Sequence, residues 1–393
     1  MTTPIWYQST DTGAPTLNNA AGSLLEVLRS CLVYGYNTKT VTSIAVSAGV
    51  ATATCAGHGY ADTFGKRVTL AGSTQPLLNG SKQITSVTTN TFVFSAPGVA
   101  DGTYTGTLSA KRTPLGWAEV HSGTNVAVFG RTAPQATAML LRVDDSNVAP
   151  ASSSSARVLM LEAATGVDSY TGPTPTAARL AGGQHWLKGA VDATPKPWVL
   201  IGDGRRLYFF VMNTGSGTDH FCHAFGDFTS YRAADAYACF LAGHVAAGAL
   251  NSSSIQQSNV LAFTAVDAAF LAARPSSQIG VGVRLNANGF VPNGASNAVA
   301  GGAGFPVYPS PVDNGCVIHA PVLLSEDNAV FKHPVRGELP GIAHPLGGAP
   351  FVNASVIPSV LGSDRQFLAV RTSGVNDGAT AAGQILIDIT GPW

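Results

Sequence analysis

Short runs rich in Val, Ile, Thr, Leu and aromatic residues recur along this sequence, separated by turns containing Gly, Asn, Pro and Asp. Runs of this length and composition are typical of β-strands. A helical spacing of apolar residues is clear only over residues 17–34, and no repeat of fixed period is visible. The sequence therefore predicts a mainly β fold with one short N-terminal helix, and it disfavours solenoids and propellers.

The predicted helix carries one apolar stripe, because its apolar residues recur at spacings of three, four and seven. These residues are Leu24, Leu25, Val27, Leu28, Cys31 and Leu32. Asn19 or Ser23 can cap the start of the helix, and Gly35 stands where a left-handed residue commonly ends one. We expect this helix to pack against a sheet.

Residues 39–112 have the texture of a separate small module. Four strand-like segments follow one another there at spacings of roughly 10 to 15 residues, as in an all-β domain. These segments are TSIAVSAGVATATCAG, RVTLAG, SKQITSVTTNTFVFSA and GTYTGTLSA. We expect residues 39–112 to form a self-contained, Ig-like β-sandwich or barrel.

Residues 1–38 and 113–393 are predicted to form one large β-rich, sandwich-like body. The turn at residues 202–204 (Gly-Asp-Gly) predicts a hairpin between PWVLI and RLYFFV. Apolar residues occupy both faces of the second of these strands, which indicates a central strand buried on both sides.

Two segments read as loops. One is the serine run at residues 152–155, and the other spans residues 285–314, which are dense in Gly, Asn, Pro and Ala. A loop of that second length is unusual in a compact domain unless it is functional or held by a neighbour. We therefore expect residues 285–314 to act as an arm that embraces another subunit.

Charged residues make up only 11% of the chain, against about 25% in an ordinary soluble domain. The exposed surface must therefore consist largely of Ser, Thr, Asn, Gly and Ala. Such a surface suits β-proteins with outward hydroxyl groups, and it suits subunits covered by neighbours in an assembly. The 22 basic and 22 acidic residues leave no net charge to neutralise phosphates, so a nucleic-acid partner is not expected.

The first residues lack the pattern of a secretory signal, and no run of about 18 apolar residues indicates a membrane span. We expect synthesis in the cytoplasm and reduced, buried thiols, because five dispersed cysteines do not form a disulfide framework. They are Cys31, Cys55, Cys222, Cys239 and Cys316.

Five further segments are distinctive: residues 9–36, 115–131 (LGWAEVHSGTNVAVFGR), 140–146 (LLRVDDS), 196–211 and 225–243. Together they resemble a family of virion structural proteins of tailed phages that infect proteobacteria. In that family the first segment passes almost directly into the second, so the resemblance implies that residues 39–112 are an insertion.

The resemblance implies a structural role in the virion, with no catalytic residues to carry over. We expect a homo-oligomeric subunit whose partners are copies of itself and other virion proteins, located at the tail or baseplate. Two alternatives stay open: a capsid decoration protein, and a receptor-binding protein that recognises host surface glycans.

The densest metal-like cluster is DHFCHAFGD, which contains His220, Cys222, His223 and Asp227. On a strand, His220 and Cys222 share one face while His223 points to the other, so the cluster would not converge on a zinc ion. We therefore expect histidines satisfied at a strand edge, with no metal and no cofactor.

The sequence contains no motif of a hydrolase, metalloprotease or nucleotide-binding enzyme. The acids that could serve in glycoside cleavage are few and dispersed, and no catalytic residue is assigned. They are Asp144, Asp145, Asp203, Asp227, Asp235, Glu326 and Asp327. Asp144, Asp145 and Asp203 are expected to hydrogen-bond their own backbone in turns. Arg205 and Arg206, beside Tyr208, are expected to solubilise an edge strand.

Aromatic residues offer two interpretations. If exposed, they could form a platform for sugars; if buried, they anchor a core or an interface. The residues concerned are Trp186, Trp198, Phe225, Phe228 and Tyr231. The module itself offers a glycan reader only Tyr60 and Tyr104, and no tryptophan.

Overall fold

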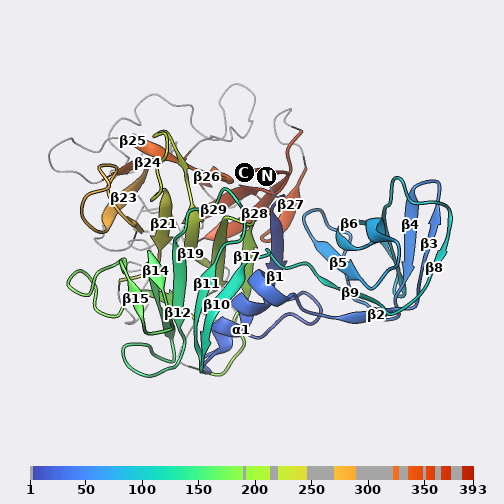
Figure 1. The fold of residues 1–393 in the computed structure, drawn as a ribbon, viewed down its shortest axis with the longest axis horizontal. Helices are drawn as coiled ribbons and strands as arrows, with labels where there is room; N and C mark the ends of the chain where they lie inside the picture. Colours follow the sequence, from blue (N-terminus) through green and yellow to red (C-terminus); the bar gives the residue numbers. More distant parts are fainter. Residues whose placement is uncertain are drawn as a thin grey trace.

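A computed structural model describes residues 3–188, 192–212, 220–245, 270–288, 322–326, 335–347, 351–358, 364–372 and 383–393. Within these ranges strands dominate and there is one α-helix, so the prediction of a mainly β fold with a short N-terminal helix is confirmed. Figure 1 shows a large lobe and, beside it, a smaller lobe formed by residues 39–112.

The first layer of the large lobe is an antiparallel five-stranded sheet. Its strands, in spatial order, are β10 (Ala118–Gly123), β11 (Val126–Gly130), β12 (Leu140–Asp144), β13 (Ser155–Leu161) and β16 (Gln184–Leu187). A small hairpin, β14 (Ala163–Ala164) and β15 (Tyr170–Thr171), follows β13.

The second layer is a 14-stranded sheet. Its main path runs β1 (Ile5–Gln8), β17 (Trp198–Gly202), β18 (Arg206–Met212), β19 (His220–Asp227), β21 (Cys239–Ala242), β22 (Phe270–Ala272), β23 (Val283–Asn288), β24 (Val322–Glu326), β25 (Val335–Leu339) and β20 (Thr229–Ser230). Off this path, β28 (Phe367–Thr372) pairs with β19, with β27 (Ser355–Ile357) and with β29 (Gly383–Asp388), and β29 pairs with β26 (Ile342–Gly347).

Strands β17 to β19 are buried on both faces because side chains alternate along a strand. Leu207 and Phe209 of β18 pack into a core that they share with residues of the five-stranded sheet, among them Phe129 of β11. Tyr208 and Phe210 pack into a second core against later strands of the same curled sheet. The predicted central strand and the predicted hairpin between β17 and β18 are confirmed.

The helix is shorter than predicted: α1 spans Ser23–Arg29 and continues as a π-helical turn, Ser30–Tyr34. Its apolar stripe lies in the core shared by the two sheets, as expected. Gly35 ends the turn with a φ of 74°. The expected caps were wrong, because neither Asn19 nor Ser23 caps the helix and Gly22 stands at the N-cap without a side-chain bond.

In residues 39–112, strands β2 to β9 pair with one another and enclose their own apolar core. They are β2 (Lys39–Val41), β3 (Ser43–Ser47), β4 (Val50–Thr54), β5 (Arg67–Ala71), β6 (Gly80–Val87), β7 (Thr91–Ser95), β8 (Gly102–Tyr104) and β9 (Leu108–Arg112), with a 3₁₀ turn at Pro76–Leu78. The first half of β6 pairs with β5 and the second half with β7, so one strand joins two half-sheets. We call residues 39–112 the module and the large lobe the body; that the module is an insertion stays a prediction.

Three local expectations need correction or restriction. Residues 285–288 form the end of β23 and are not a loop, whereas residues 289–314 lie outside the described ranges. Of the serine run, residues 152–154 form a turn and Ser155 begins β13. Arg206 is 1% exposed, because β18 lies between β17 and β19 and is not an edge strand.

Candidate functional site

The metal-like cluster does not converge. Strand β19 places Cys222 in the core of the curled sheet, while the ring of His223 stacks on Trp186 on the opposite face. Asp227 bonds Arg131 instead, with Oδ1 at 2.7 Å from Nη1. No group of His, Cys, Asp and Glu in the described ranges could hold a metal ion. All the histidines on this strand are buried, so the expectation of strand-edge histidines was wrong.

The candidate acids are engaged one by one. Asp144 accepts from the backbone N–H of Ser146, and Asp203 accepts from those of Arg205 and Arg206, as expected for turns. For Asp145 the expected bond to its own turn was wrong, because its carboxylate bonds the start of α1 and Lys188. Asp327 lies outside the described residues.

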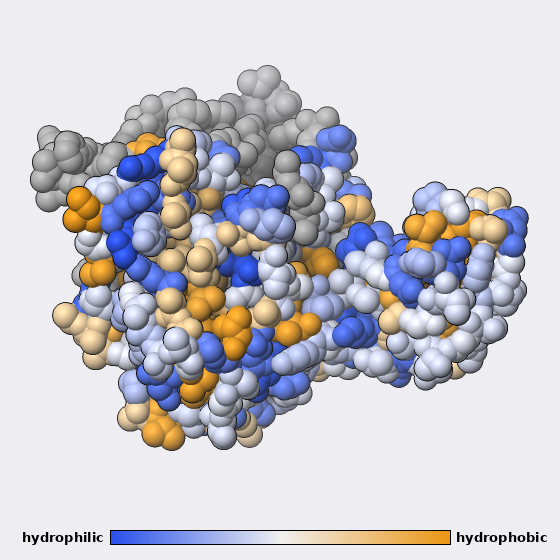
Figure 2. All heavy atoms as spheres, in the orientation of Figure 1, coloured by the Kyte–Doolittle hydropathy of each residue, from blue (hydrophilic) through white to orange (hydrophobic). Residues whose placement is uncertain are grey.

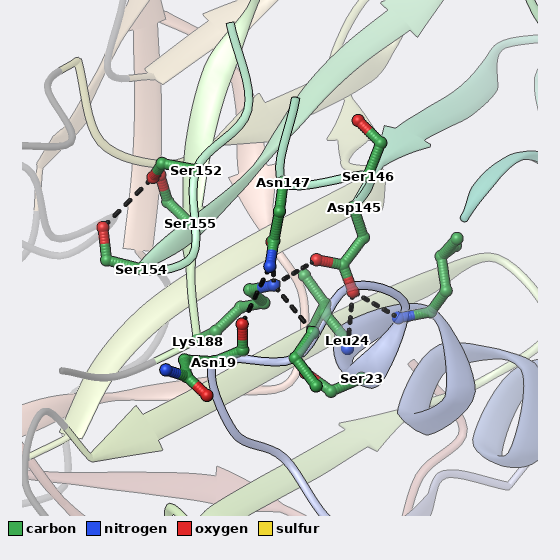
Figure 3. A network of polar contacts seen from close by, with 12 residues as sticks. Asn19, Ser23, Leu24, Asp145, Ser146, Asn147, Ser152, Ser154, Ser155 and Lys188 are labelled. Carbon is green, nitrogen blue, oxygen red and sulfur yellow. Dashed lines mark hydrogen bonds and ion pairs between the residues drawn. The ribbon is translucent and has the colours of Figure 1, made fainter. Parts of the chain in front are cut away.

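Asp145 and Lys188 form a buried pair at the start of α1 (Figure 3). Asp145 Oδ2 accepts from the backbone N–H of Leu24 at 2.8 Å, and Oδ1 accepts from Lys188 Nζ at 2.6 Å. Lys188 Nζ also donates to Asn147 Oδ1 at 2.7 Å and to the carbonyl of Ala20 at 3.0 Å. Asp145 thereby caps the helix from a distant part of the chain, which local sequence patterns could not reveal.

Burial is the largest influence on Asp145 and raises the pKa of its carboxyl, while Lys188 and the two helix N–H groups act in the opposite direction. The pair is therefore costly to desolvate and depends on complete hydrogen bonding. Its geometry is that of a brace between the helix and the five-stranded sheet.

A second buried network centres on Arg336 of β25. Its guanidinium bonds both oxygens of Asp235 at 2.9 Å and Glu326 Oε1 at 2.8 Å. Glu326 also accepts from the backbone N–H of Ser276 at 2.6 Å. Both carboxylates are thus engaged by one buried guanidinium.

The aromatic residues resolve into core residues and one surface residue. Trp186, Trp198, Phe225 and Phe228 are all buried, whereas Tyr231 is 57% exposed. The interpretation as core anchors is therefore correct for four of the five, and these residues form no sugar platform. In the module, Tyr60 is buried and donates to the carbonyl of Ala110 at 2.8 Å.

The outer face of the five-stranded sheet is the clearest candidate interaction surface. Val120 of β10 is 42% exposed, and its Cγ1 and Leu140 Cδ2 lie 3.2 and 3.3 Å from the position where Gly130 would carry a Cβ. Val120 is exposed, Leu140 is half-buried and Gly130 lies buried between them; we call these three residues the β10 strip. Figure 2 shows apolar side chains among polar ones on the face of the body over β10 and β11.

The same outer face is already covered farther along. Leu159 and Leu161 pack with Val128 beneath the β14–β15 hairpin, where Tyr170 contributes its ring. The hairpin thus shields one part of the face. Leu140 packs against the same covered cluster, whereas Val120 stays exposed. The module offers a second apolar site, where Val50 and Leu77 are 49% and 54% exposed.

Much of the limited charge is withdrawn from the exterior. Eight basic and five acidic side chains of the described residues are buried. They are Lys66, Arg112, Arg142, Arg157, Lys188, Lys196, Arg206, Arg336, Asp145, Asp203, Asp227, Glu326 and Asp388. The exterior is therefore poorer in charge than the composition alone implies.

Comparison with known proteins gives no family: no family model matches this chain, and no curated protein is significantly similar to it. In the described ranges, no helix is long and apolar enough to span a membrane.

Proposed function

We propose that this chain is a non-enzymatic structural subunit of a tailed-phage virion, assembled through protein–protein contacts and located at the tail or baseplate. The observation that carries the proposal is the scarcity of charge on the exterior. Only 11% of residues are charged, and thirteen of those are buried. A largely neutral surface favours association, and neighbouring subunits in a particle would cover it.

The β10 strip supports this proposal as one contact surface. Val120 is an exposed apolar side chain on a rigid sheet beside the half-buried Leu140, an arrangement that a neighbouring subunit would cover. A stable interface buries about 1,600 Å² in total, so the strip would form only the centre of a larger contact. The proposal places a neighbouring subunit over β10, Gly130 and Leu140.

A structural role is favoured over glycan recognition because of where the aromatic rings lie. A sugar platform needs exposed rings side by side, whereas the four buried aromatic residues named above belong to cores. The engaged carboxylates likewise favour a structural role over glycoside cleavage.

The test is a charge placed on the β10 strip. Val120→Lys introduces an ammonium at the proposed contact, and desolvating it there costs several kcal/mol. We expect the variant to fold as the wild type does but to be incorporated into particles at least tenfold less in a complementation assay. The matched control is Val148→Lys, because Val148 is 67% exposed and lies beyond the opposite end of β12.

Equal incorporation of Val120→Lys and Val148→Lys into particles would contradict the proposal that the β10 strip is a contact surface. Thermal unfolding of both purified variants separates a folding defect from an assembly defect.

A further inference from the structure

The two sheets of the body meet at a seam along β16. On one side β16 pairs with β13 as the last strand of the five-stranded sheet. On the other side His185 forms a β-bridge with His244, just beyond β21, with N–H to carbonyl distances of 2.8 and 2.9 Å. Trp186 Nε1 adds a bond of 3.0 Å to the carbonyl of Ala242. We call β16 with these contacts the seam.

Two histidines close the seam as hydrogen-bond acceptors. His223 Nε2 lies 2.9 Å from the backbone nitrogen of Leu187, and that N–H can only donate. His185 Nε2 contacts Arg157 Nη1, and a guanidinium also can only donate. Both Nε2 atoms must therefore be unprotonated, which makes both imidazoles neutral.

The Nδ1 atoms of His185 and His223 carry the ring protons. His185 Nδ1 lies 2.8 Å from Ser155 Oγ, so its proton is donated to that hydroxyl. His223 carries its proton on Nδ1, which has no hydrogen-bond partner among the described residues. A further proton on either ring would place a donor against a donor, and at His185 it would place a cation against Arg157.

Among the described residues, no carboxylate acts on these rings. From β13 the charged group is the guanidinium of Arg157, which has Asp144 of β12 opposite it. From the segment after β21 the titratable group is the imidazole of His244, 5.3 Å from that of His223. The ammonium of Lys188, next along from the seam, is directed to Asp145 and Asn147.

Uncharged rings complete the surroundings. Phe209 of β18 lies 6.3 Å from His223, and Phe221 lies 5.5 Å from His244. Trp186 of β16 stacks on His223 with centroids 5.7 Å apart. An imidazolium would thus be formed among aromatic rings and a guanidinium, with no carboxylate paired to it in the described part of the chain.

We propose that the seam is an acid-sensitive latch, in which protonation of His185 and His223 releases β16 from the large sheet. This inference goes beyond the proposed function and does not depend on it. The latch is closed at neutral pH, where both rings accept, and it opens as the pH falls through the range in which exposed histidines titrate.

The direction follows from linkage. Burial is the main cause that lowers the pKa of His185 to about 3 and of His244 to about 4, and it holds the pKa of His223 well below its usual value. In the open state these groups return to a pKa of about 6.5, so the open state binds more protons at acidic pH. The closed seam has its full stability above about pH 6.5. Below that pH, the equilibrium constant for closing the seam falls by about tenfold per pH unit for each histidine.

Hydrogen–deuterium exchange of the full chain tests the latch. The protection of residues 184–188 is measured between pH 7.5 and 5.0, after correction for the intrinsic exchange rate, with β5 of the module as internal reference. We expect the seam to lose at least about tenfold in protection per pH unit below 6, while β5 keeps its protection.

Glutamine substitutions supply the critical variant. His185→Gln with His223→Gln keeps an acceptor and a donor at each site and removes the titration of these two rings. His244 still titrates, so the seam should lose much less protection at pH 5.0 than the wild type does, but not none. The control is His121→Gln on β10, because His121 Nε2 contacts the carbonyl of Ala164 outside the seam. The control should lose protection as the wild type does.

Two outcomes overturn the latch: constant protection of the wild-type seam down to pH 5.0, or an unchanged loss of protection in the double variant. If the double variant does not fold, the wild type decides. Loss at β16 with β5 intact supports the latch, and uniform loss contradicts it.

Discussion

At the residue scale, the described interior of this protein contains buried ion pairs. Asp145 and Lys188 are both 0% exposed in their side chains, as are Arg131 and Asp227. Buried pairs of this kind are costly to desolvate and specify one arrangement of the elements that carry them. Here the first pair ties α1 to the sheet it covers.

Replacing Lys188 by methionine should destabilise the body by about 3–5 kcal/mol, because Asp145 is left as an uncompensated buried charge. The double variant Lys188→Met with Asp145→Asn should recover a large part of that loss, since the amide oxygen can still accept from Leu24. Urea unfolding of both variants measures the difference. Equal destabilisation by the single and double changes would contradict the charge argument.

At the element scale, strand β1 is one of the contacts between body and module. Trp6 donates from its backbone N–H to the carbonyl of Gly65 at 3.2 Å and from Nε1 to that of Phe64 at 2.8 Å. Lys66 Nζ lies 4.1 Å from the centroid of the Trp6 ring and pairs with Asp11. These buried contacts hold the module in one orientation against β1.

Gly65→Ala tests that contact. Gly65 has a φ of +78°, and a Cβ there would lie 2.7 Å from Trp6 Cδ1. The matched control is Gly57→Ala, with a φ of +56° and nothing within 4 Å of the added carbon. Both changes carry backbone strain, so we expect Gly65→Ala to be less stable than the control by about 1–3 kcal/mol in thermal unfolding. Equal stability of the two variants would contradict the contact.

Elements set by local patterns were predictable, whereas contacts between distant segments were not. The strands, the β17–β18 hairpin and the apolar stripe of α1 follow from short-range periodicity. The cap of α1 comes from Asp145, 121 positions from Leu24, and no local signal identifies it. The prediction for Arg206 was wrong because a turn followed by two arginines is typical of a solvent-exposed edge strand. The local sequence does not reveal that β19 pairs with β18 on its other side.

At the scale of the whole molecule, the few charged residues are used largely to connect the two sheets, the helix and the module. Buried ions join the elements, and hydroxyl and small residues are left to cover much of the exterior. The candidate surface was only partly predictable for the same reason. The composition predicted an exterior covered by neighbours. The position of the β10 strip could not be predicted, because it depends on which part of the outer face the β14–β15 hairpin covers.

The central claim is that neighbouring subunits cover this exterior. If the chain is a virion subunit as proposed, quantitative mass spectrometry of purified virions tests this claim most directly. The account predicts peptides from the whole chain at a copy number that matches a symmetry order such as about 3, 6 or 12. Absence of the chain from particles, with the purified protein a freely soluble monomer that turns over a substrate, would contradict it.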